Sequence, residues 1–249
     1  MQTPVAVVLA AGKGTRMGSD LAKVLHRVAD APMVYFPIRA ALAAGVGDVV
    51  VVVGHQASTV EAAVTEAFPT VRFAEQRQQR GTGHAVCCAL EAVRGDSGQV
   101  LILSGDVPML REQTLRELLR AATASSAGVA LTAFEPVHPA GYGRILRQGG
   151  RVVGIREEGD ATPAERELRE CNAGVYCAEL ALLREILPKL GSDNAQGEIY
   201  LTDLIAEAAK RGQVAVVAVS ADEVAGINTP EQLAQVDARL RKLSREIDH

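Results

Sequence analysis

The chain has 249 residues, a formal net charge of −4 and a pI near 5.8. Hydrophobic residues make up 48% of it and aromatic residues 3%, with no Trp, which excludes a disordered chain and argues against a base-stacking nucleic-acid platform. Because no block of Lys or Arg occurs, we expect no nucleic-acid partner, no membrane partner and small substrates.

The cysteines at positions 87, 88, 171 and 177 show no CxxC spacing, which favours neither a disulfide framework nor a zinc site. The N-terminus lacks a basic segment ahead of its apolar stretch, so we expect neither a signal peptide nor a membrane span. The length suits one large α/β domain. We therefore expect a single domain in the reducing cytoplasm.

The first predicted strand is the apolar run Val5 to Ala11, which suits a parallel strand buried on both faces. A glycine loop, Gly12 to Arg16, follows directly and offers backbone amides and cations to an anion. The Walker pattern fails here, and the dinucleotide fingerprint GxGxxG meets Met17 where its third glycine belongs. We therefore predict a different kind of phosphate loop, with Lys23 as a further cation; a plain strand-to-helix turn is the alternative.

Strands and helices alternate through the next segments, as in a doubly wound parallel sheet. Pro37 predicts a kink or a broken first turn in the first helix, and Ser58 with Glu61 resembles a capping box that opens the second. The predicted elements are a helix over 32–44, a strand over 48–53, a helix from 58 to 68 and a strand over 71–74.

A polar loop, EQRQQRGTGH over 75–84, leads into a helix predicted from Ala85 to Val93. Glutamine side chains and backbone groups provide the donors and acceptors that a uracil edge requires. Gly81 and Thr82 would let a flat ring lie close against the chain. This loop is therefore a candidate base-binding segment, with a solvated surface loop as the alternative.

The next buried strand, 100–104, delivers Gly105 and Asp106 at its carboxyl end, where ligands of open α/β sheets gather. A carboxylate beside a phosphate loop suits Mg²⁺, which shares its shell with phosphates and water. Asp106 is therefore the candidate metal ligand, and a turn or helix-capping aspartate is the alternative.

The pattern changes after Gly128. A strand over 129–135 precedes a Gly149-Gly150 turn that suits two antiparallel strands, and we expect this half to form a smaller lobe beside the sheet. A late strand is predicted over 214–219, and Thr229-Pro-Glu-Gln232 predicts a capped helix with proline at its first position.

The stretch LAAGKGTRMGSDLAKVLH resembles the signature LAAGxGTRMxSxxPKVLH of sugar-1-phosphate nucleotidyltransferases, in particular the pyrophosphorylase half of the bifunctional N-acetylglucosamine-1-phosphate uridylyltransferases. QRGTGHA, PAGYGRI, GIRE, CNAGV and NAQGEIYLTD resemble further motifs of that family in the same order. Ala22 departs from the family proline, which loosens the loop but removes no functional group. Ser104 departs from the family tyrosine, which puts the tyrosine's contribution in doubt.

The resemblance implies a Rossmann-like, mostly parallel sheet with a sugar-side β lobe, and no left-handed β-helix. It implies one domain over 1–249, with a nucleotide-binding part over 1–127, a sugar-binding part over 128–228 and a C-terminal helix over 229–249. The site residues that it implies are Arg16 and Lys23 for catalysis; Leu9, Ala10, Ala11, Gly12, Gly14, Gln76, Gln79, Gly81, Thr82 and Gly105 for the nucleotide; Gly141, Glu157 and Asn172 for the sugar; and Asp106 and Asn228 for Mg²⁺.

The implied reaction joins UTP and N-acetylglucosamine 1-phosphate into UDP-N-acetylglucosamine and pyrophosphate. Every motif lies before residue 230, so we expect the site to be complete within one domain. Two alternatives stay open, namely transfer with another sugar or nucleotide and a non-catalytic nucleotide-sugar sensor.

Overall fold

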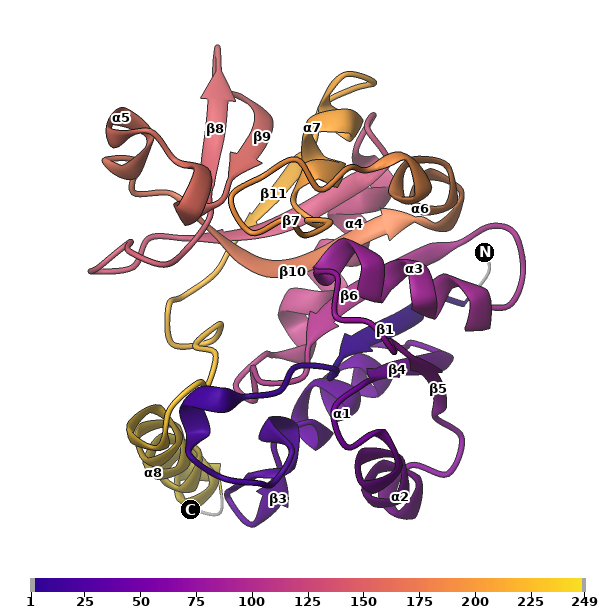
Figure 1. Ribbon diagram of the computed structural model, residues 1–249, viewed down its shortest axis with the longest axis vertical. Helices are drawn as coiled ribbons and strands as arrows, with labels where there is room; N and C mark the ends of the chain where they lie inside the picture. Colours follow the sequence, from indigo (N-terminus) through magenta and orange to yellow (C-terminus); the bar gives the residue numbers. More distant parts are fainter. Residues whose placement is uncertain (1–2, 248–249) are drawn as a thin grey trace.

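A nine-stranded sheet forms the centre of the protein, shown in Figure 1 as a computed structural model that describes residues 3–247. Its main path runs β11-β7-β10-β6-β1-β4-β5, and β8 and β9 extend from β10 as a hairpin. The strands are β1 (Val5–Leu9), β4 (Asp48–Val53), β5 (Arg72–Glu75), β6 (Gln99–Ser104), β7 (Val129–Phe134), β8 (Arg144–Gln148), β9 (Arg151–Arg156), β10 (Cys171–Glu179) and β11 (Ala215–Ala218).

The sheet is mostly parallel around β1, which pairs in parallel with both β4 and β6. The chain leaves β1 first toward β4 and later returns on its other side as β6, which is the doubly wound arrangement. β10 lies antiparallel between β6 and β7 and joins the two halves into one continuous sheet. The predicted fold class is therefore confirmed, with an antiparallel strand that the sequence patterns did not reveal.

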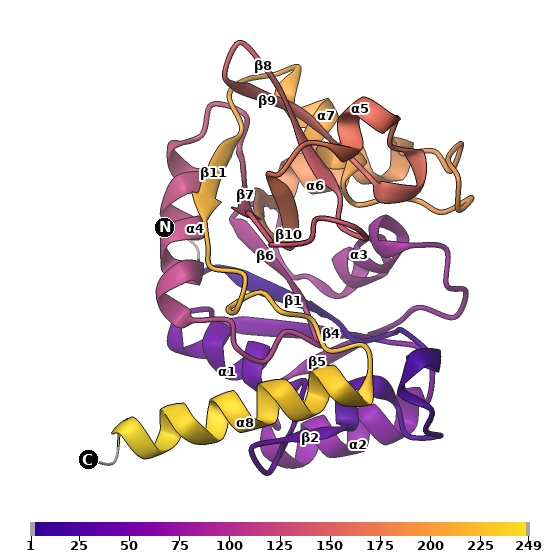
Figure 2. The ribbon, with the colours of Figure 1, turned by 90° about the vertical axis from the view of Figure 1, so that its left-hand side faces the viewer.

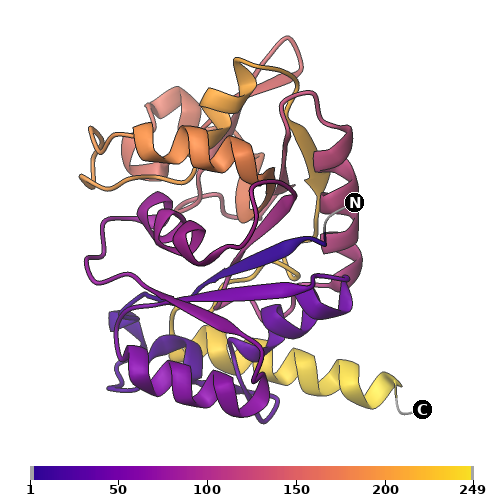
Figure 3. The same ribbon diagram turned by 90° about the vertical axis from the view of Figure 1, so that its right-hand side faces the viewer.

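Helices cover both faces of the sheet, and residues along β1 alternate between the two cores. Val7 packs on the face covered by α3 (Thr82–Ala92), α6 (Leu180–Ile186) and α7 (Asp203–Ala209). Ala6 and Val8 pack on the face covered by α1 (Tyr35–Ala43), α2 (Ala57–Ala67) and α4 (Glu112–Ala124). Figure 3 shows the resulting layers edge-on. A short α5 (Pro163–Arg166) follows the β9 strand.

The last helix, α8 (Pro230–Ile247), lies along a small hairpin of β2 (Arg27–Val28) and β3 (Ala31–Pro32), as Figure 2 shows. The predicted cap is present: the Gln232 N–H donates to Thr229 Oγ1 at 3.3 Å, and the Thr229 N–H donates to Gln232 Oε1 at 3.2 Å. An apolar cluster that includes Met17 and Val236 seals this contact. The helix is thereby tied to the segment that follows the glycine loop.

Some local predictions were wrong. The helix expected over 32–44 begins at Tyr35 because Pro32 belongs to β3, and Pro37 falls in the first helical turn, where a missing N–H breaks no helical bond. The expected capping box at Ser58 and Glu61 does not form, since α2 begins earlier at Ala57. The helix expected from Ala85 begins at Thr82.

Over residues 3–247 the chain forms no left-handed β-helix, and none of its helices is long and apolar enough to cross a bilayer.

Candidate active site

The glycine loop after β1 packs against the stem of Lys23. Gly14 has φ +61°, a left-handed conformation that suits glycine, and it precedes the 3₁₀ turn Thr15–Met17 that carries Arg16. A Cβ on Gly14 would lie 3.0 Å from Lys23 Cγ and 3.2 Å from its Cδ, and closer still to its Cβ. The loop therefore leaves room for the Lys23 side chain only because residue 14 is glycine.

Gln56 holds the segment just before Lys23. The Ala22 N–H donates to Gln56 Oε1 at 2.9 Å, and Gln56 Nε2 donates to the Asp20 carbonyl. Ala22 stands where the resemblance expects proline, whose ring nitrogen carries no hydrogen. The departure removes no functional group, as expected, and it adds a backbone donor that Gln56 binds.

Four side chains from distant parts of the chain meet beyond the carboxyl end of β6. Lys23 Nζ forms an ion pair with Asp106 Oδ2 and donates to Asn228 Oδ1 at 2.8 Å. Arg16 Nη2 donates to the same Asn228 oxygen at 3.0 Å. The Ile227 N–H donates to the Asp106 carbonyl at 3.0 Å, which ties the chain before α8 to the end of β6. The predicted catalytic and metal-binding residues thus lie together.

The donor set of this cluster fits a divalent metal ion. The Asp106 carboxylate and the Asn228 amide oxygen already converge on one cation, the Lys23 ammonium. Hard oxygen ligands of this kind suit Mg²⁺, which takes one or two carboxylates and completes its shell with phosphates and water. The described residues hold no group of three or more His, Cys, Asp or Glu side chains suited to a metal, so substrate oxygens would be needed.

A hollow of about 240 Å³ lies between the glycine loop and the start of α3. Its floor comes from the end of β1, and the polar loop after β5 forms one wall. The lining residues are Leu9, Ala11, Gly12, Gln76, Gln79, Gly81, Thr82, Ala85 and Glu198. Seven of these nine belong to the predicted nucleotide set, and the mixture of apolar and amide side chains suits a polar ring such as a nucleobase.

Two glutamines shape this hollow. Gln79 Nε2 donates to the Ala11 carbonyl at 2.6 Å, which links the polar loop to the glycine loop. Gln76, with 5% of its surface exposed, donates through Nε2 to the Gly81 carbonyl at 3.0 Å. Gly81 has φ +101°, and a Cβ there would meet the Ile199 carbonyl oxygen at 2.5 Å, so only glycine fits. The polar loop and the segment around Ile199 are therefore in close contact.

The 194–203 segment contacts both the polar loop after β5 and Glu157, a predicted sugar-binding residue. The Ile199 N–H donates to the Arg80 carbonyl at 2.8 Å, and the Leu201 N–H donates to Thr82 Oγ1 at 3.1 Å. At its far end Thr202 Oγ1 donates to Glu157 Oε1 at 2.9 Å. Glu198 and Thr202 thus belong to the site although neither was predicted. The motif NAQGEIYLTD was the signal for them.

The predicted sugar residues lie on the second half of the sheet. Burial raises the pKa of the Glu157 carboxyl, although the Thr202 hydroxyl opposes this. Asn172 Nδ2 donates to the Tyr176 hydroxyl at 2.6 Å, and the Asn172 N–H donates to the Gly143 carbonyl at 2.8 Å. Because β10 runs antiparallel to β6, Asn172 near its start lies toward the carboxyl end of β6.

Three residues that were predicted to bind the nucleotide or the sugar do not line this hollow. Ala10 is buried, and its N–H donates to the Val52 carbonyl at 2.9 Å, so it supports the loop from within the sheet. Gly105 is also buried, and a Cβ there would meet the Leu9 carbonyl oxygen at 2.9 Å. Gly141 has φ +88° in an exposed turn with no described atom within 4 Å of an added Cβ. None of the three lines the base hollow.

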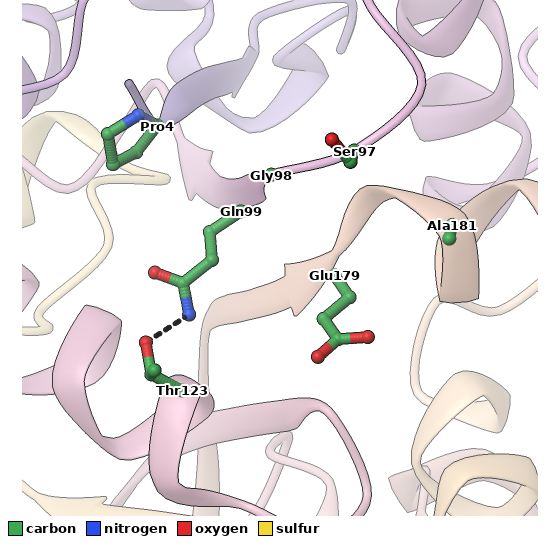
Figure 4. A pocket seen from close by; sticks show the side chains of 7 residues that line it. All are labelled: Pro4, Ser97, Gly98, Gln99, Thr123, Glu179 and Ala181. Carbon is green, nitrogen blue, oxygen red and sulfur yellow. Dashed lines mark hydrogen bonds between the residues drawn. The ribbon is translucent and has the colours of Figure 1, made fainter. Parts of the chain in front are cut away.

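A larger hollow, about 520 Å³, lies at the opposite end of β6, as Figure 4 shows. It is lined by Pro4, Ser97, Gly98, Gln99, Thr123, Glu179 and Ala181. Glu179 supplies a carboxylate and no Lys or Arg lines the space, so its charge does not suit a phosphate. The smaller hollow, lined in part by Gly12 of the glycine loop, is therefore the better candidate for a nucleotide.

Residues 6–166 match the family described as the MobA-like NTP transferase domain. The chain is 52% identical over 240 residues to a "Bifunctional protein GlmU" of Anaeromyxobacter dehalogenans and 49% identical over 248 residues to that of Geobacter metallireducens. These alignments cover 95% and 97% of this chain but 49% and 52% of the relatives, so the chain spans about half the length of the curated relatives it matches.

A solved structure described as a glucose-1-phosphate thymidylyltransferase of Bacillus anthracis has a similar fold. Its TM-score is 0.77 at 20% sequence identity, and the match covers 96% of each chain. This likeness supports the fold and no more.

Proposed function

Because this chain belongs to the MobA-like NTP transferase domain family, we propose that it transfers a nucleotidyl group to a sugar 1-phosphate. The observation that carries the proposal is the convergence of Arg16, Lys23, Asp106 and Asn228, with a hollow lined in part by Gly12 of the same glycine loop. Two cationic side chains and two oxygen ligands at one point suit a polyphosphate with its metal ion.

The substrates we propose are UTP and N-acetylglucosamine 1-phosphate, and the products are UDP-N-acetylglucosamine and pyrophosphate. The half-length match to bifunctional GlmU proteins supports this choice. The 194–203 segment supports it too, since it resembles the motif of the N-acetylglucosamine enzymes and contacts both the base loop and Glu157.

In the proposed reaction an oxygen of the sugar phosphate attacks the α-phosphorus of UTP in line. The bond from that phosphorus to the oxygen bridging to the β-phosphate breaks, and pyrophosphate leaves with the electron pair. Lys23 and Arg16 neutralise the phosphate charge that grows in the transition state, so most of the rate enhancement comes from positioning and fixed charge. Mg²⁺ held by Asp106 and Asn228 would supply further charge neutralisation when bound.

The remaining residues orient the two substrates. Gln76 and Gln79 face the base hollow, while Glu157 and Asn172 offer a carboxylate and an amide to the sugar. Lys23 is the cation that must leave Asp106 for the phosphates when substrate binds. No covalent nucleophile is required.

Pyrophosphate release tests this proposal. The chain is incubated with Mg²⁺, with each of UTP, TTP, CTP and GTP, and with N-acetylglucosamine 1-phosphate or glucose 1-phosphate. Release that is fastest with UTP and N-acetylglucosamine 1-phosphate, and that stops on chelation of the metal, supports it. Another preferred pair would show a different transferase, and nucleotide-sugar binding without release would show a sensor.

A further inference from the structure

The orientation of the Gln76 side-chain amide is fixed by its neighbours. Its Nε2 lies 3.0 Å from the Gly81 carbonyl oxygen, and a carbonyl oxygen can only accept a hydrogen bond. The opposite orientation would place two acceptors against each other. The side-chain nitrogen of Gln76 is therefore the atom bound to the Gly81 carbonyl.

His84, on the first turn of α3, makes the second contact with this nitrogen. His84 Nδ1 lies 3.0 Å from Gln76 Nε2. Since Nε2 is a donor, Nδ1 must accept, which requires the neutral tautomer with hydrogen on His84 Nε2. That nitrogen lies 3.8 Å from Cys88 Sγ, a weak acceptor one helical turn further on. The opposite tautomer would place two donors against each other beside Gln76.

These two contacts commit both hydrogens of the Gln76 amide and leave its Oε1 free. Oε1 has no hydrogen-bond partner among the residues that the structure describes, and Gln76 lines the base hollow. The Gln76 atom left to pair with a ring that enters the hollow is therefore an acceptor. A uracil ring presents a donor N–H at its N3 position, whereas a cytosine ring presents a bare, accepting nitrogen there.

We propose that His84 is a positioning residue that holds the Gln76 amide with its oxygen toward the base, and that this contact makes the site prefer uracil over cytosine. The proposal rests on the proposed nucleotidyl transfer from UTP. It assigns no chemistry to His84 itself, which acts only through Gln76. Without His84 the Gln76 amide keeps a single partner, the Gly81 carbonyl. The amide then rotates more easily to present its N–H group to cytosine.

The first test compares kcat/KM for UTP and for CTP in four proteins: the parent chain, His84→Leu, His84→Asn and Cys88→Ala. His84→Leu removes the acceptor, and we expect the UTP preference to fall about tenfold, the size of one hydrogen bond between uncharged groups. In His84→Asn the Oδ1 atom can take the place of Nδ1, so the preference should return to within about threefold of the parent. Cys88→Ala leaves the contact with Gln76 in place and should change nothing.

An unchanged UTP preference in His84→Leu would overturn the proposal. A loss of UTP preference in His84→Asn as large as in His84→Leu would also overturn it, because it would show that the volume of the ring matters and not its acceptor. The free energy of unfolding of each variant, from denaturant titration, separates a folding defect from a change in base preference.

The second test needs no turnover. Nitrogen-15 NMR of the His84 ring in the full chain should show hydrogen on Nε2 and none on Nδ1, and the opposite result would overturn the proposal. Calorimetric titration with UTP and with CTP gives the base preference as a ratio of dissociation constants. If no nucleotide triphosphate were turned over, the proposed function would fail, while the tautomer and this ratio would still decide the role of His84.

Discussion

Replacing Gly14 with alanine should damage catalysis far more than it damages the fold. Two glycines flank the 3₁₀ turn that carries Arg16, and both Gly14 and Gly18 have φ +61°. Alanine at either position pays a similar cost for the left-handed backbone, about 1 kcal/mol of unfolding free energy. The two positions differ in their surroundings, because an added Cβ at Gly18 meets no described atom within 4 Å.

At Gly14 the added Cβ would overlap the Lys23 stem, with Cγ at 3.0 Å and Cδ at 3.2 Å. Ordinary contacts between carbon atoms lie near 3.5 to 4.0 Å, so the stem must move by about 1 Å. Lys23 Nζ would then leave its place between Asp106 and Asn228. A misplacement of about 1 Å can cost about a hundredfold in rate, so we expect kcat of Gly14→Ala to fall about a hundredfold.

The assay is the initial rate of pyrophosphate release at saturating substrates, with Gly18→Ala as the matched control. We expect the control to keep kcat within about threefold of the parent and to lose about 1 kcal/mol of unfolding free energy, whereas Gly14→Ala loses more because its Cβ overlaps the Lys23 stem. Equal kcat values for Gly14→Ala and Gly18→Ala would refute the reasoning. They would show that the loop does not position Lys23.

Three further perturbations test the site. Asp106→Asn should abolish turnover with the fold intact, because a neutral amide holds Mg²⁺ poorly between phosphates; activity within about tenfold of the parent would contradict the metal assignment. Lys23→Ala should lower kcat about a hundredfold through loss of a fixed charge, and an unchanged rate would make Lys23 structural. Burial raises the pKa of Glu157, so this carboxyl holds its proton more tightly in the folded protein than in the unfolded chain. The protein therefore loses stability as the pH rises from the usual value of 4.5 through the raised pKa. Glu157→Gln should remove this loss, so the free energy of unfolding, measured by denaturant titration at about pH 4 and about pH 8, should fall less with pH than in the parent. An equal fall in the variant and the parent would argue against a buried carboxyl.

Much of the fold could be predicted because its strands are apolar runs that end in glycine or polar residues. The runs at Val5 and Asp48 became β1 and β4, and the Gly149-Gly150 turn joins β8 to β9. The β2–β3 hairpin was missed because each strand has two residues, too few for a hydrophobic period. The antiparallel place of β10 was missed because strand order depends on long-range packing.

The residues proposed for the nucleotide come from short contiguous motifs at the ends of strands, so the sequence alone could bring them forward. The sugar side depends on contacts between remote segments, such as the hydrogen bond from Thr202 to Glu157. No local pattern reveals such a pair. The capping box at Ser58 failed for a similar reason: Gln56 holds the N-cap position of α2, and its side chain binds the remote segment before Lys23 instead of the helix.

The clamp between Gln56 and the Ala22 N–H has a consequence for how these two positions can change over evolutionary time. Gln56 has φ +53°, a conformation uncommon for a residue with a side chain, and Ala22 has φ −52°, which a proline ring also adopts. With proline at position 22 the amide hydrogen disappears and Gln56 Oε1 loses its partner. Proline at 22 should then accompany glycine at 56, and alanine at 22 should accompany glutamine, so that the two sites covary as a pair. Loss of the glutamine at 56 while position 22 stays alanine would leave the segment before Lys23 with neither a stiff ring nor a side-chain tether.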